Sequence, residues 1–201
     1  MKNIKIFCVF LFTLFLLTLF ITGCKDKYEY VDYEKLEADE LKLLERFYES
    51  KFFEDSVLSK AVLIAKDTLD TLDLRKTLKL FMLRTYRSNH KDTIKTGQVV
   101  GYRYRFYYLN TVDSASVDAP LLFTNRYSNE PDYYVAGNYT TTSAAMSYGI
   151  DYAIRNMFLF DRCTVIIPSS IGAQSILGSY SAKDRYKIII AEIEVTYHPR
   201  N

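Results

Sequence analysis

Hydrophobic and polar positions follow three different patterns along the chain. Residues 6–21 form a nearly continuous apolar run, which two lysines precede. From Asp32 to Phe53, apolar residues recur at spacings of three and four among many Glu and Lys side chains, which predicts an amphipathic helix. From Thr77 onward, short runs with a period of two predominate, which predicts strands. The chain therefore divides into an apolar leader, one helix and a β-rich region.

The β-rich region predicts an antiparallel sheet with one helix. Strands are expected at Thr77–Tyr86, Val99–Leu109, Leu121–Thr124, Tyr133–Val135, Cys163–Ile167 and Tyr186–Tyr197. A short helix is expected at Ser147–Phe158, between the fourth and fifth strands. This order predicts an α+β fold in which the sheet wraps a single helix. Residues 57–65 fit a strand or a helix, and residues 67–74 are expected to be an exposed loop.

The second expected strand separates aromatic from basic side chains. Tyr102, Tyr104 and Phe106 share one face, while Arg103 and Arg105 share the other. Aromatic side chains interleaved with arginines are typical of surfaces that stack single-stranded nucleic acid. Because the two kinds of side chain point to opposite faces here, the pattern argues against that function.

The expected helix over residues 32–53 has an acidic polar face and a narrow apolar stripe. Helices that lie on anionic membranes carry Lys and Arg on that face, so this one does not fit a lipid surface. A stripe that packs on the protein's own domain is the first interpretation, and a partner-binding helix is the alternative. Its many charges predict a helix that is loosely docked on the β-rich region or set apart from it.

The leader ends in Ile21-Thr22-Gly23-Cys24, which resembles the lipobox of bacterial lipoproteins. A basic start, an apolar run and small residues at its end make a secretory signal peptide. The resemblance implies that residues 1–23 are removed and that Cys24 becomes a lipidated first residue, since two or more acyl chains give a stable anchor. An outer-membrane lipoprotein, on the periplasmic face or the cell surface, is expected. The alternatives are a plain signal peptide or an uncleaved transmembrane helix.

Charge and composition exclude several other functions. Without residues 1–23, 24 basic side chains face 24 acidic ones, so the formal net charge is zero. Nucleic-acid binders need surplus Lys and Arg, so no nucleic-acid partner is expected. Cys163 has no cysteine partner once Cys24 is acylated and Cys8 is removed, and we expect it to be a buried hydrophobe. With two histidines far apart in the sequence, no metal and no cofactor are expected.

Residues 76–198 resemble the FKBP-type peptidyl-prolyl isomerases and the divergent FKBP-like lipoproteins of Bacteroidetes. The matching blocks, in order, are Thr77–Tyr86 with Lys95–Val100; Phe123 with Pro131, Tyr134 and Gly137; Met146–Met157; Val165–Ala173; and Ile188–Val195. The resemblance implies an FKBP-like sheet around one short helix, and a substrate proline held in an aromatic pocket between them.

Several pocket positions of that family are changed in this chain. Ile150 stands where the family has tryptophan, Thr124 where it has aspartate, and Ala173 where it has tyrosine. Ala191 replaces a phenylalanine of the closing strand, Phe106 replaces a tyrosine, and Phe123 matches. With Met146, these residues make up the candidate ligand groove, namely Phe106, Phe123, Thr124, Met146, Ile150, Ala173 and Ala191. The chain has no Trp at all, so the loss of the tryptophan does not depend on the alignment.

Three functions follow from these observations. The first is a membrane-tethered module with a degenerate FKBP-like domain that binds another envelope protein or a peptide. The second is a periplasmic or surface prolyl isomerase with an unusual pocket, and the third is a purely structural lipoprotein. The expected segments are a signal peptide (1–23), a tether with the amphipathic helix (24–56), a connecting segment (57–75) and the FKBP-like domain (76–201). An open cleft between the helix and the sheet would favour a binding function. A cleft filled by side chains would favour a purely structural function.

Overall fold

A computed structural model describes residues 31–65, 68–109, 121–139, 146–172 and 186–197. From Asp32 onward, these residues belong to one compact unit, Asp32–Asn201. The proposed lipid-attachment residue Cys24 and the candidate groove residue Ala173 lie outside the described residues.

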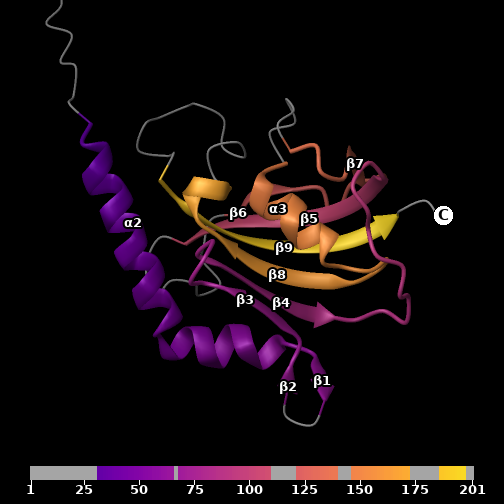
Figure 1. The fold of residues 1–201 in the computed structure, drawn as a ribbon, viewed down its shortest axis with the longest axis horizontal. Coiled ribbons are helices and arrows are strands. Elements are labelled where there is room, and N and C mark those ends of the chain that lie inside the picture. Colours follow the sequence, from indigo (N-terminus) through magenta and orange to yellow (C-terminus); the bar gives the residue numbers. More distant parts are fainter. Residues whose placement is uncertain (1–30, 66–67, 110–120, 140–145, 173–185, 198–201) are drawn as a thin grey trace, which may run out of the picture. The chain divides into compact units, whose positions relative to one another are not determined.

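Seven strands among the described residues form one antiparallel sheet (Figure 1). They are β3 (Thr71–Leu74), β4 (Leu80–Tyr86), β5 (Val99–Leu109), β6 (Leu121–Thr124), β7 (Asp132–Val135), β8 (Arg162–Ile167) and β9 (Ile188–Tyr197). Their order is β3-β4-β8-β9-β5-β6, and β7 also pairs with β5. The antiparallel sheet and the α+β class are confirmed, and each of the six expected strands starts and ends within three residues of the prediction.

The short helix α3 (Tyr148–Arg155) packs on one face of the sheet, called here the inner face. Its first turn is capped by the Ser147 side chain, which accepts a hydrogen bond from the Ile150 N–H at 3.3 Å. Ile150, Ala153 and Ile154 are fully buried, as their helical spacing requires. They share one core with alternate residues of the central strands, including Met82, Val100, Phe106, Val165, Ile167, Ile189, Ala191 and Ile193.

One close contact sets how near α3 lies to the sheet. A β-carbon added at Gly149 would lie only 2.6 Å from Cγ2 of Ile167 on β8. No larger residue fits there without a shift of the helix or of Ile167. Gly149 therefore permits the observed spacing between α3 and β8.

The opposite, outer face of the sheet carries a second core under the N-terminal helix. Helix α2 (Tyr33–Tyr48) begins after Asp32, whose side chain accepts from the Lys35 N–H at 3.0 Å. It is followed by a π-helical turn η1 (Phe53–Val57) and a 3-10 turn η2 (Leu58–Lys60). Fully buried Phe47 packs edge-on against Phe53. This second core contains Leu44, Phe47, Phe53, Val57, Phe81, Leu83, Leu109, Ile166 and Ile188.

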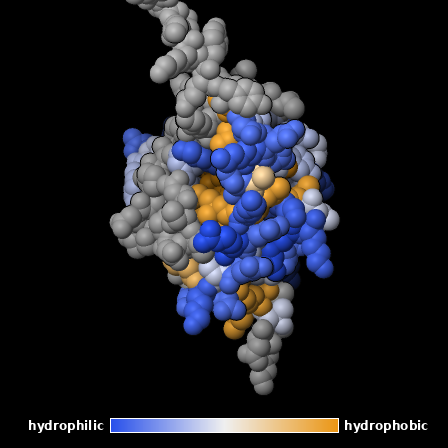
Figure 2. Space-filling model, turned by 90° about the vertical axis from the view of Figure 1, so that its left-hand side faces the viewer, coloured by the Kyte–Doolittle hydropathy of each residue, from blue (hydrophilic) through white to orange (hydrophobic). Residues whose placement is uncertain are grey.

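The prediction that this helix is loosely docked or set apart is wrong. Phe47 is 0% exposed and Leu44 is 1% exposed, which places the stripe of α2 in the interior. The stripe is narrow, as expected, but the aromatic residues that follow it extend the contact. Phe53 lies 5.1 Å from Phe81 of β4 between ring centroids, in an edge-to-face arrangement. Seen from the side of α2, the coloured surface is mostly hydrophilic, with hydrophobic residues visible between hydrophilic ones (Figure 2).

A buried carboxylate also joins α2 to the loop after β8. Glu40, 7% exposed, accepts hydrogen bonds from the Ser169 N–H at 2.6 Å and from the Ser169 hydroxyl. Ser169 opens the 3-10 turn η3 (Ser169–Ile171). Burial raises the pKa of Glu40 above its ordinary value, although the two hydrogen bonds oppose that rise.

The prediction of an exposed loop over residues 67–74 is also wrong. Strand β2 (Thr68–Leu69) pairs with β1 (Leu63–Ala65), and β3 forms the edge of the main sheet beside β4. In β3 the exposed Thr71 and Asp73 alternate with half-buried Leu72 and Leu74, which pack on the inner core. An edge strand with one solvated face needs only this weak alternation, which is easily read as a polar loop.

Candidate functional site

The first candidate site is the inner face, where the family resemblance places a ligand groove. The structure brings together Phe106 of β5, Ala191 of β9, Ile150 of α3 and Met146, which lies just before α3. Phe106 and Ala191 are direct cross-strand partners. Ile150, Phe106 and Ala191 are 0% exposed and Met146 is 1% exposed. These four residues therefore fill the hydrophobic core.

The other candidate residues are Phe123, Thr124 and Ala173, and of these only Thr124 has a described side chain. The backbone of Phe123 pairs with that of Phe106 in the β5–β6 ladder. Thr124 pairs with Arg105, so it belongs to the outer face of the sheet. Its hydroxyl donates to the Tyr104 carbonyl at 3.0 Å and accepts from the Arg126 N–H at 3.1 Å. Thr124 thus stabilises the turn after β6.

Aromatic rings of β5 stack on one another along the inner face. The ring centroid of Tyr104 lies 5.5 Å from that of Tyr102 and 4.3 Å from that of Phe106, with nearly parallel planes in the second pair. Burial, helped by Asp132, raises the pKa of Tyr104 to about 12, so its hydroxyl stays protonated at neutral pH. The separation of aromatic and basic residues predicted for β5 is confirmed. Along the described length of β5, these rings pack on each other.

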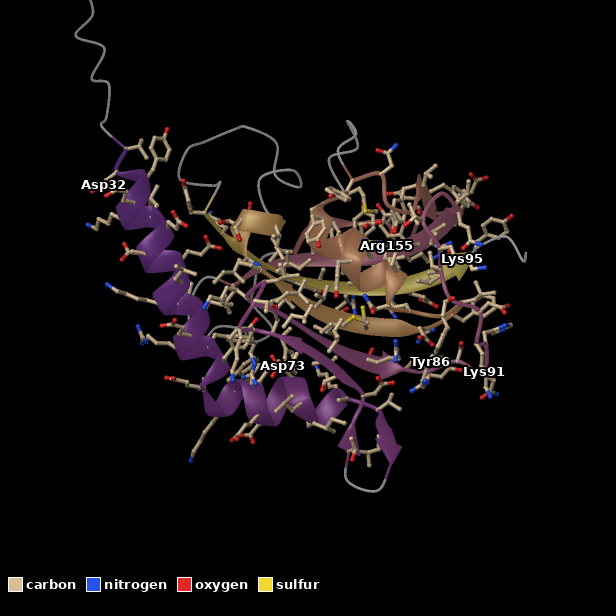
Figure 3. All side chains as sticks on the ribbon, viewed as in Figure 1. Asp32, Asp73, Tyr86, Lys91, Lys95 and Arg155 are labelled. Carbon is tan, nitrogen blue, oxygen red and sulfur yellow. The ribbon has the colours of Figure 1, made fainter. Side chains whose placement is uncertain are left out.

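The outer face offers a second candidate site, a groove of about 490 Å³, called here the arginine groove. Its floor consists of alternate residues of three adjacent strands, namely Arg103, Arg105, Arg162, Thr164, Glu192 and Glu194. Lys60 of η2, Arg126 after β6, and Tyr86 at the end of β4 also line it; Tyr86 is labelled in Figure 3. The apolar half of the same face lies under α2, and this polar half is open.

Ion pairs hold most of the guanidinium groups over the floor. Arg162 donates to Glu194 at 3.1 Å. Both Arg105 and Arg126 pair with Glu192, the latter at 3.8 Å. These groups are a quarter to a half exposed, so each pair contributes little to stability. The consequence is mainly geometric, because the side chains are fixed in the groove.

Arg103 has a different role at the groove wall. Its guanidinium donates to the backbone carbonyls of Asn125, Arg126, Ser128 and Asn129, at 2.8 to 3.3 Å. These contacts hold the turn after β6 beside the groove, which places Arg126 at the rim. Carbonyl oxygens are neutral, so they satisfy the donors of Arg103 without neutralising its charge.

Sequence reasoning missed the arginine groove. It placed Arg103 and Arg105 on one face of β5 but did not bring Arg126, Arg162 and Lys60 to them. A signal was present, because β9 carries charged residues at alternate positions, Glu192 and Glu194, and β8 carries polar residues at alternate positions, Arg162 and Thr164. Only the strand order β8-β9-β5 makes these three patterns neighbours.

A third polar cluster is structural. Arg84, 9% exposed, lies on the inner side of β4 and pairs with Asp70 at 2.8 Å and with fully buried Asp161 at 2.9 Å. Asp161 also accepts from the Ser88 and Phe158 N–H groups, at 2.8 and 2.9 Å. These contacts satisfy the charges and tie two loops to the sheet edge.

Cys163 is buried within the inner core, as predicted. Burial raises the pKa of its thiol to about 12, which keeps it protonated and unreactive. Within the described ranges, no cluster of three His, Cys, Asp or Glu side chains is placed to hold a metal ion. In the same ranges, no helix has both the length and the apolar character needed to cross a membrane.

The antiparallel sheet with one short helix across its inner face defines an FKBP-like α+β fold. A peptidyl-prolyl cis-trans isomerase from Pseudomonas syringae pv. tomato is similar to this chain, with a TM-score of 0.51 and 14% identity. The match covers 85% of this chain and 98% of that enzyme. The three FKBP domains of wheat FKBP73 match with a TM-score of 0.46 and 16% identity, over 66% of this chain and 50% of that one.

These matches are to structures alone. No protein-family model matches the sequence, and no curated protein matches it. At 14% identity the likeness to the Pseudomonas enzyme shows a shared fold and leaves the activity of this chain to be argued from its own residues.

Proposed function

We propose that this protein is a membrane-tethered FKBP-fold module of the cell envelope that binds or assembles with other molecules without catalysing prolyl isomerisation. The observation that carries the proposal is the burial of Phe106, Met146, Ile150 and Ala191 at the positions of the family's substrate groove. Side chains that are 0 to 1% exposed have no surface to offer to a substrate proline.

Physical chemistry explains why an open groove is needed. Rotation about the X-Pro bond is slow because amide resonance opposes it, with a barrier of about 18–20 kcal/mol. A catalyst must bind the twisted amide better than the planar one. In the family this is done by holding the proline ring against aromatic side chains, including a tryptophan that this chain replaces by Ile150. Here Ile150 is itself buried in the protein's core, which supports the proposal.

The test is an isomerase assay on X-Pro peptides and on the refolding of a protein limited by proline isomerisation. The Pseudomonas isomerase serves as the positive control. We expect acceleration at least about a hundredfold below that control, because each missing pocket contact removes on the order of 1–3 kcal/mol of discrimination. A rate comparable to the control would contradict the proposal, provided that Ile150→Lys abolishes it in a variant that keeps its circular dichroism spectrum.

The tether is supported by the leader and by Cys24, which follows the lipobox-like residues directly. We expect Cys24→Ser to release the protein from membranes or to leave an unprocessed precursor. Wild-type protein labelled with a radioactive fatty acid provides the comparison. If Cys24→Ser is processed normally and still partitions fully with membranes, the anchor lies elsewhere.

The burial of these residues also bears on where a partner would bind. A partner that entered between α3 and the sheet would displace part of the inner core, which favours contacts on another surface. Among the described residues, the arginine groove is a large and chemically distinct concavity.

A further inference from the structure

The arginine groove combines five cationic side chains with only two carboxylates. The cations are Lys60, Arg103, Arg105, Arg126 and Arg162, and the carboxylates are Glu192 and Glu194. The chain as a whole is nearly neutral, so this local surplus arises from the fold. The groove therefore has a charge of about three positive units that its own acidic residues do not balance.

The unbalanced charges are distributed between floor and rim. Arg103 is fixed by neutral carbonyl groups, so its charge is uncompensated at the floor. Arg162 contacts Glu194 through one nitrogen and has a side chain that is 49% exposed. Arg126 is 37% exposed and lies 3.8 Å from the carboxylate it faces, which is too far for a strong hydrogen bond. Arg162 of the floor and Arg126 of the rim both have N–H donors that a ligand can reach.

The glutamates position these donors. Glu194 holds Arg162, and Glu192 holds Arg105, so the guanidinium groups are arranged before a ligand arrives. The ring of Tyr86 supports Arg162 from another side, with the guanidinium carbon 5.6 Å from the ring centroid. Preorganised donors lose less entropy on binding than free side chains do.

We propose that the arginine groove binds the phosphate group of a small ligand. A guanidinium group donates two parallel hydrogen bonds to phosphate oxygens, and a dianion matches the surplus charge better than a single carboxylate does. A volume of about 490 Å³ lies within the range of small-molecule sites. The inference does not depend on whether the inner face has isomerase activity.

The experiment titrates inorganic phosphate into the purified full protein in a non-ionic detergent, at constant ionic strength kept with sodium chloride. Arginine Nε–H resonances in NMR spectra report on the guanidinium groups directly. We expect saturable shifts, and we expect Arg162→Gln to weaken binding about tenfold, as for the loss of one charge-assisted contact. Arg162 is half exposed, so this variant is expected to fold.

Two further variants separate a binding site from general charge screening. Arg46→Gln removes the same charge from the exposed side of α2, and phosphate binding is expected to be unchanged. Glu194→Gln removes a competing negative charge but keeps an oxygen that can accept from Arg162, so it is expected to tighten binding. The proposal is overturned if no saturable shift occurs, if Arg162→Gln binds like the wild type, or if Arg46→Gln weakens binding equally.

The source of the phosphate is distinguished by two soluble probes. Glycerol 3-phosphate presents a phosphate monoester, as free metabolites do, and glycerophosphoglycerol presents the diester headgroup of a phospholipid. Equal affinity for both assigns the groove to lipid headgroups, and a preference for the monoester assigns it to a soluble phosphorylated ligand. Failure to bind either probe, with no response to inorganic phosphate, overturns the inference and leaves the proposed function standing.

Discussion

The two faces of the main sheet differ although the same strands make both. On the inner face, the positions of β5, β8 and β9 pack into one apolar core beneath α3. On the outer face, the side chains change along each strand, from apolar residues under α2 to the charged residues of the open arginine groove. Strand pairing alone therefore does not assign a function to a face. The element that covers a face decides whether its residues become core or remain available to a ligand.

Strand β9 shows where the change occurs. Its outward residues are Ile188 and Ile190 at one end, then Glu192 and Glu194. The inward residues stay apolar throughout, including fully buried Ile189 and Ala191. The first half of the strand therefore has two apolar faces and the second half only one. This corresponds to the extent of the core under α2.

The largest expected effect tests whether the outer core is as integral as the inner one. Phe47 and Phe106 are both 0% exposed, one on each side of the sheet. We expect Phe47→Ala and Phe106→Ala each to lower the free energy of unfolding by about 3–5 kcal/mol, because both leave large cavities. Urea denaturation measures both changes. A loss below about 1 kcal/mol for Phe47→Ala would show that α2 is an appendage, and the comparison would fail.

A smaller effect concerns the pH dependence of the contact between α2 and η3. Burial raises the pKa of Glu40 in the folded protein above its ordinary value of 4.5. Between pH 4.5 and the raised pKa of Glu40 in the folded protein, the folded state binds more protons than the unfolded state. The free energy of unfolding therefore falls as the pH rises through this range. Below pH 4.5 the stabilisation contributed by protonated Glu40 is fully present. One group changes stability by at most about 1.4 kcal/mol per pH unit.

The matched variant is Glu40→Gln, which can still accept from the Ser169 N–H and donate to its hydroxyl. We expect its stability to fall less steeply above pH 4.5 than that of the wild type. Glu37, on the same helix, adds to the rise in pKa and is retained in both proteins. Identical pH profiles from thermal unfolding would show that Glu40 is not protonated in the fold.

The smallest effect is expected in the arginine groove. Arg105 and Glu192 are 28% and 29% exposed, so solvent screens their attraction. A double-mutant cycle with Arg105→Gln and Glu192→Gln, measured as free energies of unfolding, should give a coupling free energy of about 0.2–1 kcal/mol. A coupling above about 2 kcal/mol would mean that the pair is a structural element like Arg84 and Asp161. The arginine groove would then contribute to stability as the inner face does.

Much of the architecture could be predicted from the sequence because it depends on local periodicity. The run Val99–Leu109 has its observed bounds and the observed separation of faces. What could not be predicted depends on pairing between distant segments. The family resemblance places Thr124 in the groove, but the register of β6 sets it opposite Arg105. Glu40 belongs to an acidic helix surface in the sequence, and only its contact with Ser169 makes it a buried residue.

The close approach of Gly149 to Ile167 has a consequence for how this protein could change during evolution. A large aromatic side chain at position 150 needs space between α3 and the sheet. Gly149 is already in close contact with Ile167, so α3 cannot tilt further toward β8 to provide that space. The Asp151 side chain also holds the Gly137 N–H at 2.7 Å, so a displaced helix would lose a buried partner. A tryptophan at position 150 would therefore require coordinated substitutions on β5 and β9, where Phe106 and Ala191 lie in the same core. A single substitution at the start of α3 would not provide the space that a tryptophan needs.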